Sequence, residues 1–71
     1  MEAFQERMVN EYKELSTRVV KLKDFIFDNP LFDKLDKEER SLQIQQLTGM
    51  KIYLRALLLR LEHQGISVTE S

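Results

Sequence analysis

Three basic side chains interrupt an otherwise apolar and neutral segment in the second half of the chain. The range 41–61 contains no Asp or Glu, and its charged residues are Lys51, Arg55 and Arg60. This composition predicts a helix largely buried in protein, where a cation is costly unless an anion pairs with it. Because the chain supplies no acid nearby, we expect the anion to come from a bound ligand.

Side chains that could carry catalysis are scarce. The chain has no cysteine and a single histidine, His63, which is expected in the last turn of a helix, where positive charge complements the helix dipole. The sequence contains no glycine-rich phosphate loop, no nucleophile with a nearby base and no metal-ligand spacing. We therefore expect a protein that is not an enzyme and that has no catalytic residue, metal site or cofactor.

The charge balance and apolar content limit the classes of partner. The 71 residues carry 11 basic and 12 acidic side chains, for a net charge of -1. Such a chain has no general attraction for DNA or for an acidic membrane, and the apolar run 52–61 is too short to span a bilayer. Glu2 and Glu6 stand where a secretory signal needs basic and apolar residues. We expect a cytoplasmic protein that binds neither DNA nor membranes.

Apolar residues in the first part of the chain recur at spacings of three and four. This repeat, typical of a helix with one packed seam, predicts a helix from about Ala3 to Phe27. Its members are Phe4, Met8, Tyr12, Leu15, Val19, Leu22 and Ile26. Proline at position 30 then ends the helix, since the residue before a proline avoids the helical conformation. The range 31–35 is expected to form a short amphipathic turn.

A second helix is predicted to begin near Lys37 and to end before Gly65. Asp36 and Glu39 have the spacing of a capping box, and Gly65 can adopt the left-handed conformation that ends many helices. Its own packed seam consists of Leu47, Met50, Leu54, Leu57 and Leu61. Two seams of this kind can bury each other when the helices run antiparallel.

The predicted fold is all-α: one antiparallel two-helix hairpin over 1–66 with a short connecting helical turn, followed by a flexible tail over 67–71. A hairpin buries only one stripe of the second helix. Further apolar residues on its other sides are Leu42, Ile44, Ile52, Ala56, Leu58 and Leu59. Apolar surface this wide usually marks a subunit interface, so we expect a homo-oligomer in which the second helices meet at the centre.

Several short segments, taken in order, carry a family resemblance. They are Phe4-Gln5-Glu6-Arg7-Met8-Val9, Glu14-Leu15, Lys21-Leu22, Phe25-Ile26 and Asn29-Pro30-Leu31-Phe32, followed by Met50, Tyr53, Leu57, Arg60 and Leu61. In this combination the chain resembles the phage anti-CBASS type 2 proteins, which are sponges for cyclic oligonucleotides. The resemblance covers about residues 4–66.

The resemblance implies more than the residue spacing does. It implies a compact homohexamer that binds 3',3'-cyclic dinucleotides such as cGAMP between pairs of protomers, and cyclic trinucleotides such as cyclic triadenylate at separate sites. Proteins of that family hold the messenger without cleaving it, so that the bacterial CBASS immune effectors stay silent. The implied place of action is the cytoplasm of the infected bacterial host.

The resemblance also suggests residues of the dinucleotide site. Base stacking falls by position on Phe4, and the phosphate contact falls on Arg18 or Lys21, both of which the helical spacing admits. Arg7 and Tyr12 complete the candidate set, although a tyrosine at the position of Tyr12 more often belongs to the core, with its hydroxyl at the rim. The early aromatic residue is often tyrosine in that family. Phe4 keeps the stacking face without the hydroxyl, which leaves the choice of messenger open.

Arg60 is the residue that the resemblance suggests for the trinucleotide site, and Arg55 and Tyr53 are its candidate neighbours. Without the resemblance, a structural interpretation competes with this one. Phe4 would then be the first residue of the packed seam. The protein would be a helical-hairpin adaptor that binds an amphipathic partner helix and no nucleotide.

Overall fold

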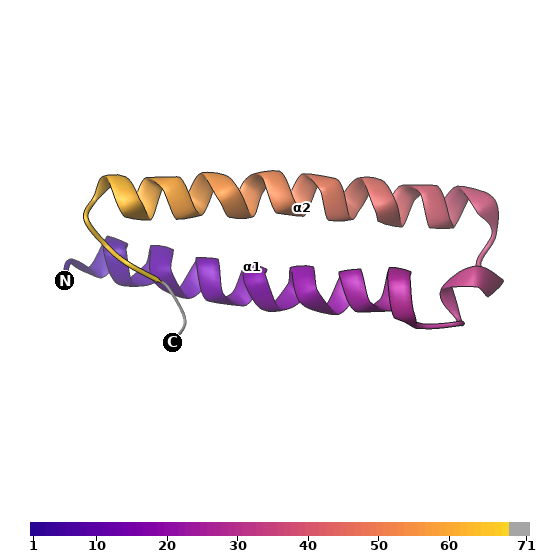
Figure 1. Ribbon diagram of the computed structural model, residues 1–71. Helices are drawn as coiled ribbons and strands as arrows, with labels where there is room; N and C mark the ends of the chain where they lie inside the picture. Colours follow the sequence, from indigo (N-terminus) through magenta and orange to yellow (C-terminus); the bar gives the residue numbers. More distant parts are fainter. Residues whose placement is uncertain (69–71) are drawn as a thin grey trace.

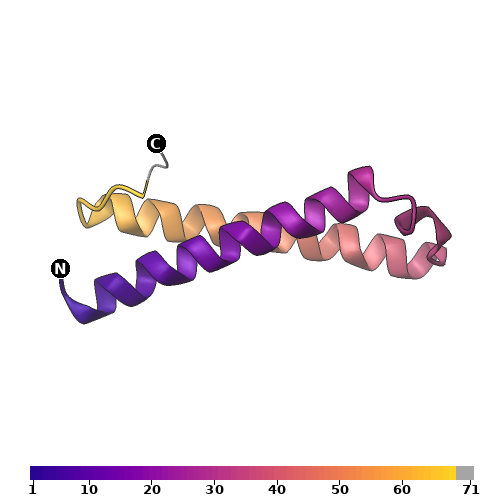
Figure 2. The same cartoon turned by 90° about the horizontal axis from the view of Figure 1, so that it is seen from below.

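The computed structural model describes residues 1–68, which form two long helices and a short connecting turn. Helix α1 spans Ala3–Asp28, the 3-10 helix η1 spans Phe32–Lys34, and α2 spans Lys37–His63. The helices run antiparallel, so the start of α1 and the end of α2 lie at the same end of the molecule (Figure 1). A second view shows that they cross at a shallow angle (Figure 2). The predicted all-α hairpin is confirmed.

Local hydrogen bonds define where both helices begin. At α2, Asp36 Oδ1 accepts from the backbone N of Glu39 at 2.8 Å. The side chain of Glu39 was expected to reach back to Asp36, but its Oε2 accepts from Gln43 Nε2 at 2.9 Å, one turn further along. Half of the predicted capping box is therefore formed. At α1, Gln5 Oε1 accepts from the backbone N of Glu2 at 2.9 Å.

Gly65 ends α2 as the sequence predicted. Its φ is 75°, in the left-handed region that glycine adopts at little cost. The backbone N of Gly65 donates to Glu62 O and that of Ile66 donates to Leu61 O, each at 2.9 Å. This pair of bonds is the Schellman motif, which satisfies the last carbonyl groups of the helix and turns the chain back.

After the turn, the chain runs back along the hairpin (Figures 1 and 2). Ile66 and Val68 pack against the hydrophobic core. Val68, which was predicted to be part of a flexible tail over 67–71, therefore lies against the helices. Residues 69–71 of that predicted tail lie outside the described part of the chain. A hydrogen bond of 2.9 Å from Gln5 Nε2 to Gln64 Oε1 also joins the start of α1 to the end of α2.

The hydrophobic core lies between the two helices and under η1. Its buried members are Met8, Leu15, Val19, Ile26, Phe32, Leu47, Leu57 and Leu61. All but Phe32 belong to the two predicted seams, which are confirmed. The rings of Phe25 and Phe32 pack edge to face with centroids 6.0 Å apart and close the core at the connecting turn. Phe4 is 47% exposed, so it is not a core residue of the single chain.

Helix α2 exposes apolar side chains on more than one side. The hairpin leaves Leu42, Ile44, Ile52, Ala56 and Leu59 exposed, as predicted. Leu58, which was expected to be exposed as well, is half-buried. The cations Lys51, Arg55 and Arg60 are also exposed. The burial predicted for the range 41–61 is therefore not present within one chain, because two antiparallel helices cover only one stripe of each other.

Candidate functional site

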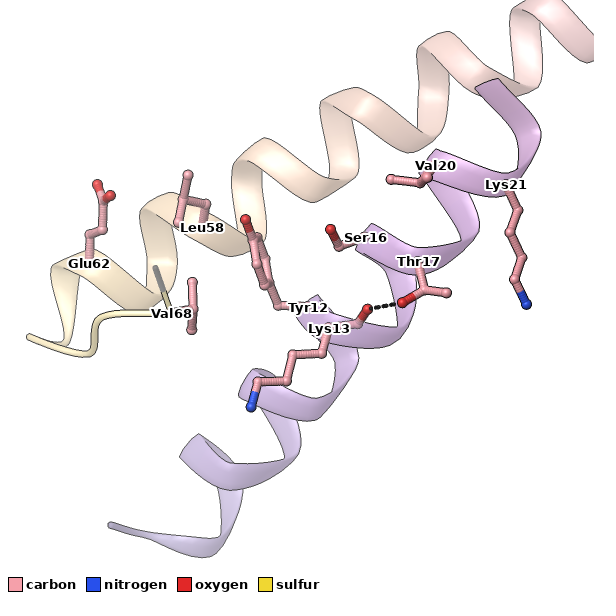
Figure 3. Close-up of a pocket in the computed structure, with 9 residues that line it drawn as sticks. All are labelled: Tyr12, Lys13, Ser16, Thr17, Val20, Lys21, Leu58, Glu62 and Val68. Atoms are coloured by element: carbon pink, nitrogen blue, oxygen red, sulfur yellow. Dashed lines mark hydrogen bonds between the residues drawn. The ribbon is translucent and has the colours of Figure 1, made fainter. Parts of the chain in front are cut away.

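A groove runs along one side of the hairpin, between the middle of α1 and the C-terminal half of α2. One section of about 750 Å³ is lined by Tyr12, Lys13, Ser16, Thr17, Val20, Lys21, Leu58, Glu62 and Val68 (Figure 3). An adjoining section of about 370 Å³ is lined by Tyr12, Ser16, Val19, Val20, Lys23, Lys51, Leu54, Arg55 and Leu58. Since the two sections share residues of both helices, they form one surface, which we name the flank groove.

The periodicity of α1 explains how its side chains reach the groove. Residues four apart lie on the same face of a helix. The larger section accordingly takes two rows from α1, which are Tyr12, Ser16 and Val20 in one and Lys13, Thr17 and Lys21 in the other. The adjoining section adds Val19 and Lys23, which are also four residues apart. Thr17 Oγ1 donates to the backbone O of Lys13 at 3.1 Å, which holds the hydroxyl against the helix (Figure 3).

Tyr12 joins the groove to the core. The side chain is half-buried and packs against the buried residues. Its hydroxyl points toward α2 beside Leu58 (Figure 3). The hydroxyl makes no hydrogen bond to any of the residues 1–68. Tyr12 therefore presents an aromatic ring to a molecule in the groove, together with a hydroxyl that none of the residues 1–68 engages.

The flank groove is positively charged. Its basic side chains are Lys13, Lys21, Lys23, Lys51 and Arg55, and its acidic side chain is Glu62. No ion pair within 4.0 Å joins any two of the residues 1–68, so these cations have no carboxylate partner in that part of the chain. An anion in the groove would therefore meet several uncompensated positive charges.

The structure separates the five predicted dinucleotide-site residues into two groups. Tyr12 and Lys21 line the flank groove. Arg18 and Arg7 are exposed on α1 and line neither section. Between the alternatives Arg18 and Lys21, it is Lys21 that lines the same section of the groove as Tyr12. Phe4 is exposed about two turns before Tyr12 on the same helix, outside the groove.

The three predicted trinucleotide-site residues do not share one side of α2. Arg55 lines the flank groove. Tyr53 and Arg60 are exposed and line neither section of it. They are seven residues apart and so lie on nearly the same side of the helix, whereas Arg55 follows Tyr53 by about 200°. A single chain therefore does not bring Arg55 together with Tyr53 and Arg60.

The sequence reasoning missed several groove residues. Lys13 could have been found, because it precedes Lys21 by eight residues on the same face as Thr17. Lys51 was noted for its charge but not assigned to a site. Val68 gave no signal in the sequence, since only the turn at Gly65 brings it to the groove.

The groove combines an aromatic ring, hydroxyl groups and cations, which suits a ligand that is flat in part and negatively charged. Among residues 1–68, no group of three His, Asp or Glu side chains is placed to hold a metal ion. Neither helix in this range is long and apolar enough to cross a membrane.

Comparison with protein families gave a match over most of the chain. The model of the Sequestin family matches residues 2–63, a range that includes all of α1, η1 and α2 and every groove residue except Val68. Comparison with curated proteins and with solved structures gave no match. The chain therefore belongs to the Sequestin family, a family of phage proteins.

Proposed function

We propose that this protein binds and sequesters cyclic oligonucleotide second messengers without cleaving them, and so keeps CBASS immune effectors inactive. The observation that carries the proposal is the flank groove, where Tyr12 lies among five cations and one carboxylate. Membership of a phage protein family supports it. The resemblance to the anti-CBASS type 2 proteins supports the choice of ligand and the host cytoplasm as the place of action.

The chemistry of a cyclic dinucleotide matches the groove. Its two phosphodiesters are ionised, and its two bases are flat. A base stacked on Tyr12 would gain about 1 to 3 kcal/mol. Lys21 and Lys13 lie on the neighbouring row of α1 and would contact phosphate as mobile point charges. Phe4, Arg7 and Arg18 are exposed and would reach the ligand from another protomer.

In a homo-oligomer, each protomer would contribute one copy of the flank groove. A two-fold axis between protomers presents matching aromatic and cationic groups to a ligand that has nearly the same symmetry. We propose a hexamer, with cyclic trinucleotides bound where Tyr53 and Arg60 of several protomers meet. An arginine at such a point can engage phosphate through two parallel hydrogen bonds. Arg55 would then serve the flank groove rather than the trinucleotide site.

Calorimetric titration with 3',3'-cyclic dinucleotides and cyclic triadenylate tests the proposal. Tyr12→Ala should weaken dinucleotide binding by about 5-fold to 150-fold, the equivalent of 1 to 3 kcal/mol of lost stacking. Lys21→Gln should weaken it as well, because one phosphate contact is lost. Lys34→Gln is the matched control, since Lys34 is exposed in η1 and outside the groove. Equal affinities for all three variants and the native protein would refute the site.

Two further outcomes separate the classes of function. A hydrolase would return linear nucleotide when the complex is denatured and its ligand analysed by mass spectrometry, whereas a sponge returns the cyclic molecule intact. Absence of binding to every messenger at large excess would favour the adaptor instead. The exposed apolar side chains Leu42, Ile52 and Leu59 of α2 are the observation in favour of that alternative.

A further inference from the structure

Helix α2 carries a second regular seam on the side that faces away from α1. Its members follow one another at alternating spacings of four and three, and they are Glu38, Leu42, Gln45, Gly49, Ile52, Ala56, Leu59 and His63. All eight are exposed in the single chain. Ile52 follows Met50, a half-buried residue that packs against the core, by about 200° around the helix, which puts the seam opposite the core. This is the spacing of a helix that packs against a second helix.

The seam is complementary to itself when two copies run antiparallel. A single register then pairs all of its residues, as Glu38 with His63, Leu42 with Leu59, Gln45 with Ala56, and Gly49 with Ile52. Each pair occurs twice, because the same residues meet on both sides of a two-fold axis. In a parallel arrangement, by contrast, each residue would face its own copy, with Glu38 against Glu38.

The pairs match in charge and in size. The acidic Glu38 in the first turn of α2 would face His63 in the last turn of the second copy, and the opposite ends of the two helix dipoles would adjoin. The neighbouring pair of Leu42 and Leu59 would exclude water from the space beside Glu38 and His63. At the centre, Ile52, which at 67% is the most exposed aliphatic side chain of the seam, would meet Gly49, the residue without a side chain.

Gly49 has no explanation within one chain. It lies inside α2, where glycine costs about 0.5 to 1 kcal/mol relative to alanine, and a Cβ atom added there would meet nothing within 4 Å. Its φ is not positive, since the positive-φ glycine of the described chain is Gly65. A hole that receives Ile52 of a second copy accounts for the missing side chain.

We propose that α2 packs antiparallel against α2 of a second copy of this chain, with the two-fold axis between residues 50 and 51. The inference rests on the homo-oligomer of the proposed function but not on its nucleotide ligand. It identifies which surface of the hairpin the protomers share, and leaves the flank groove, on another side of α2, open to ligand.

Cysteine cross-linking tests the direction of packing, because the chain has no cysteine of its own. Leu42→Cys and Leu59→Cys chains are mixed, refolded together and oxidised, and the products are weighed. Antiparallel packing predicts disulfide-linked pairs that contain one chain of each kind. Pairs of identical chains in place of mixed pairs would indicate parallel packing and overturn the proposal.

Two variants test the fit without cysteine. Gly49→Leu fills the hole and should lower the mass of the native assembly. The hairpin should stay helical, because a Cβ atom added at Gly49 meets nothing within 4 Å in the single chain and leucine favours a helix more than glycine does. Gln46→Leu, on the exposed surface outside the seam, is the matched control. His63→Glu should weaken the assembly by opposing Glu38, and Glu38→Lys in the same chain should restore it.

The outcomes distinguish this inference from the proposed function. An assembly that binds nucleotide but gives no mixed cross-link, and that Gly49→Leu leaves intact, would overturn the seam and spare the function. Mixed cross-links in a protein that binds no nucleotide would support the seam and refute the function. A protein that is monomeric at every concentration would overturn both the seam and the homo-oligomer.

Discussion

Gln43→Met should stabilise the hairpin, because Gln43 occupies a position of the packed seam. It precedes Leu47 by four residues, which places its side chain on the α1-facing side of α2. Its Oε1 is buried and has no hydrogen-bond partner. Methionine has nearly the same length and helix propensity, so the substitution removes the polar group and preserves the shape.

The expected gain follows from the hydrogen bonds on each side of the amide. A buried acceptor without a partner costs about 1 to 3 kcal/mol. The variant loses the exposed bond from Gln43 Nε2 to Glu39 Oε2, which contributes about 0.5 to 1.5 kcal/mol. The net gain is about 1 kcal/mol. For a domain of this size, that corresponds to an increase in Tm of about 4 to 8 °C.

Thermal unfolding followed by circular dichroism would measure the effect, with all proteins at one concentration because assembly raises apparent stability. Gln46→Met is the matched control. Gln46 lies three residues away and is exposed, so its replacement should change the free energy of unfolding by no more than about 0.5 kcal/mol. A Tm for Gln43→Met equal to or below that of the native protein would refute the reasoning, since it would mean that Oε1 is satisfied in the folded state.

Three substitutions test other parts of the fold by chemical denaturation at fixed protein concentration. Leu57→Ala should lower the free energy of unfolding by about 2 to 5 kcal/mol, because Leu57 is 1% exposed and its truncation leaves a cavity. A loss below about 1 kcal/mol would contradict the place of Leu57 in the core. Gly65→Ala should lower the free energy of unfolding by about 1 to 2 kcal/mol, because a residue with a Cβ atom is strained at the φ of 75° that Gly65 adopts. Unchanged stability would show that the turn is not left-handed. Asp36→Ala should cost about 0.5 to 2 kcal/mol by removing the acceptor for the Glu39 amide, whereas Asp36→Asn, which keeps an acceptor, should cost less.

The helices could be predicted from the sequence because their signals are local. The three-and-four spacing of apolar residues, Pro30 and the pair Asp36 and Gly65 each act within a few residues, and the structure confirms the elements they indicate. The capping box was only half right, since Glu39 has a second partner, Gln43, one turn away on the same helix. A local pattern does not decide between two partners that are both within reach.

The site was harder to predict, because the flank groove depends on contacts between distant segments. Tyr12 and Arg55 lie on different helices, and only the register of the hairpin brings them to one surface. Val68 arrives there through the turn at Gly65. The prediction that the range 41–61 is largely buried was wrong for the single chain. The apolar content of a helix shows that it can be covered on several sides, but not which neighbouring helices cover it.

The hairpin topology also decides how the protein responds to mechanical load. The start of α1 and the end of α2 lie together (Figure 1), so a pull between them acts across the helices and not along them. The first layers to resist are those of Leu57 and Leu61, which are 1% and 0% exposed, with Ile66 and Val68 packed over the same core. Once these layers part, the remaining layers toward the connecting turn separate one helical turn at a time. Resistance to a protease that unfolds its substrate from one end is therefore concentrated in a few residues near that end.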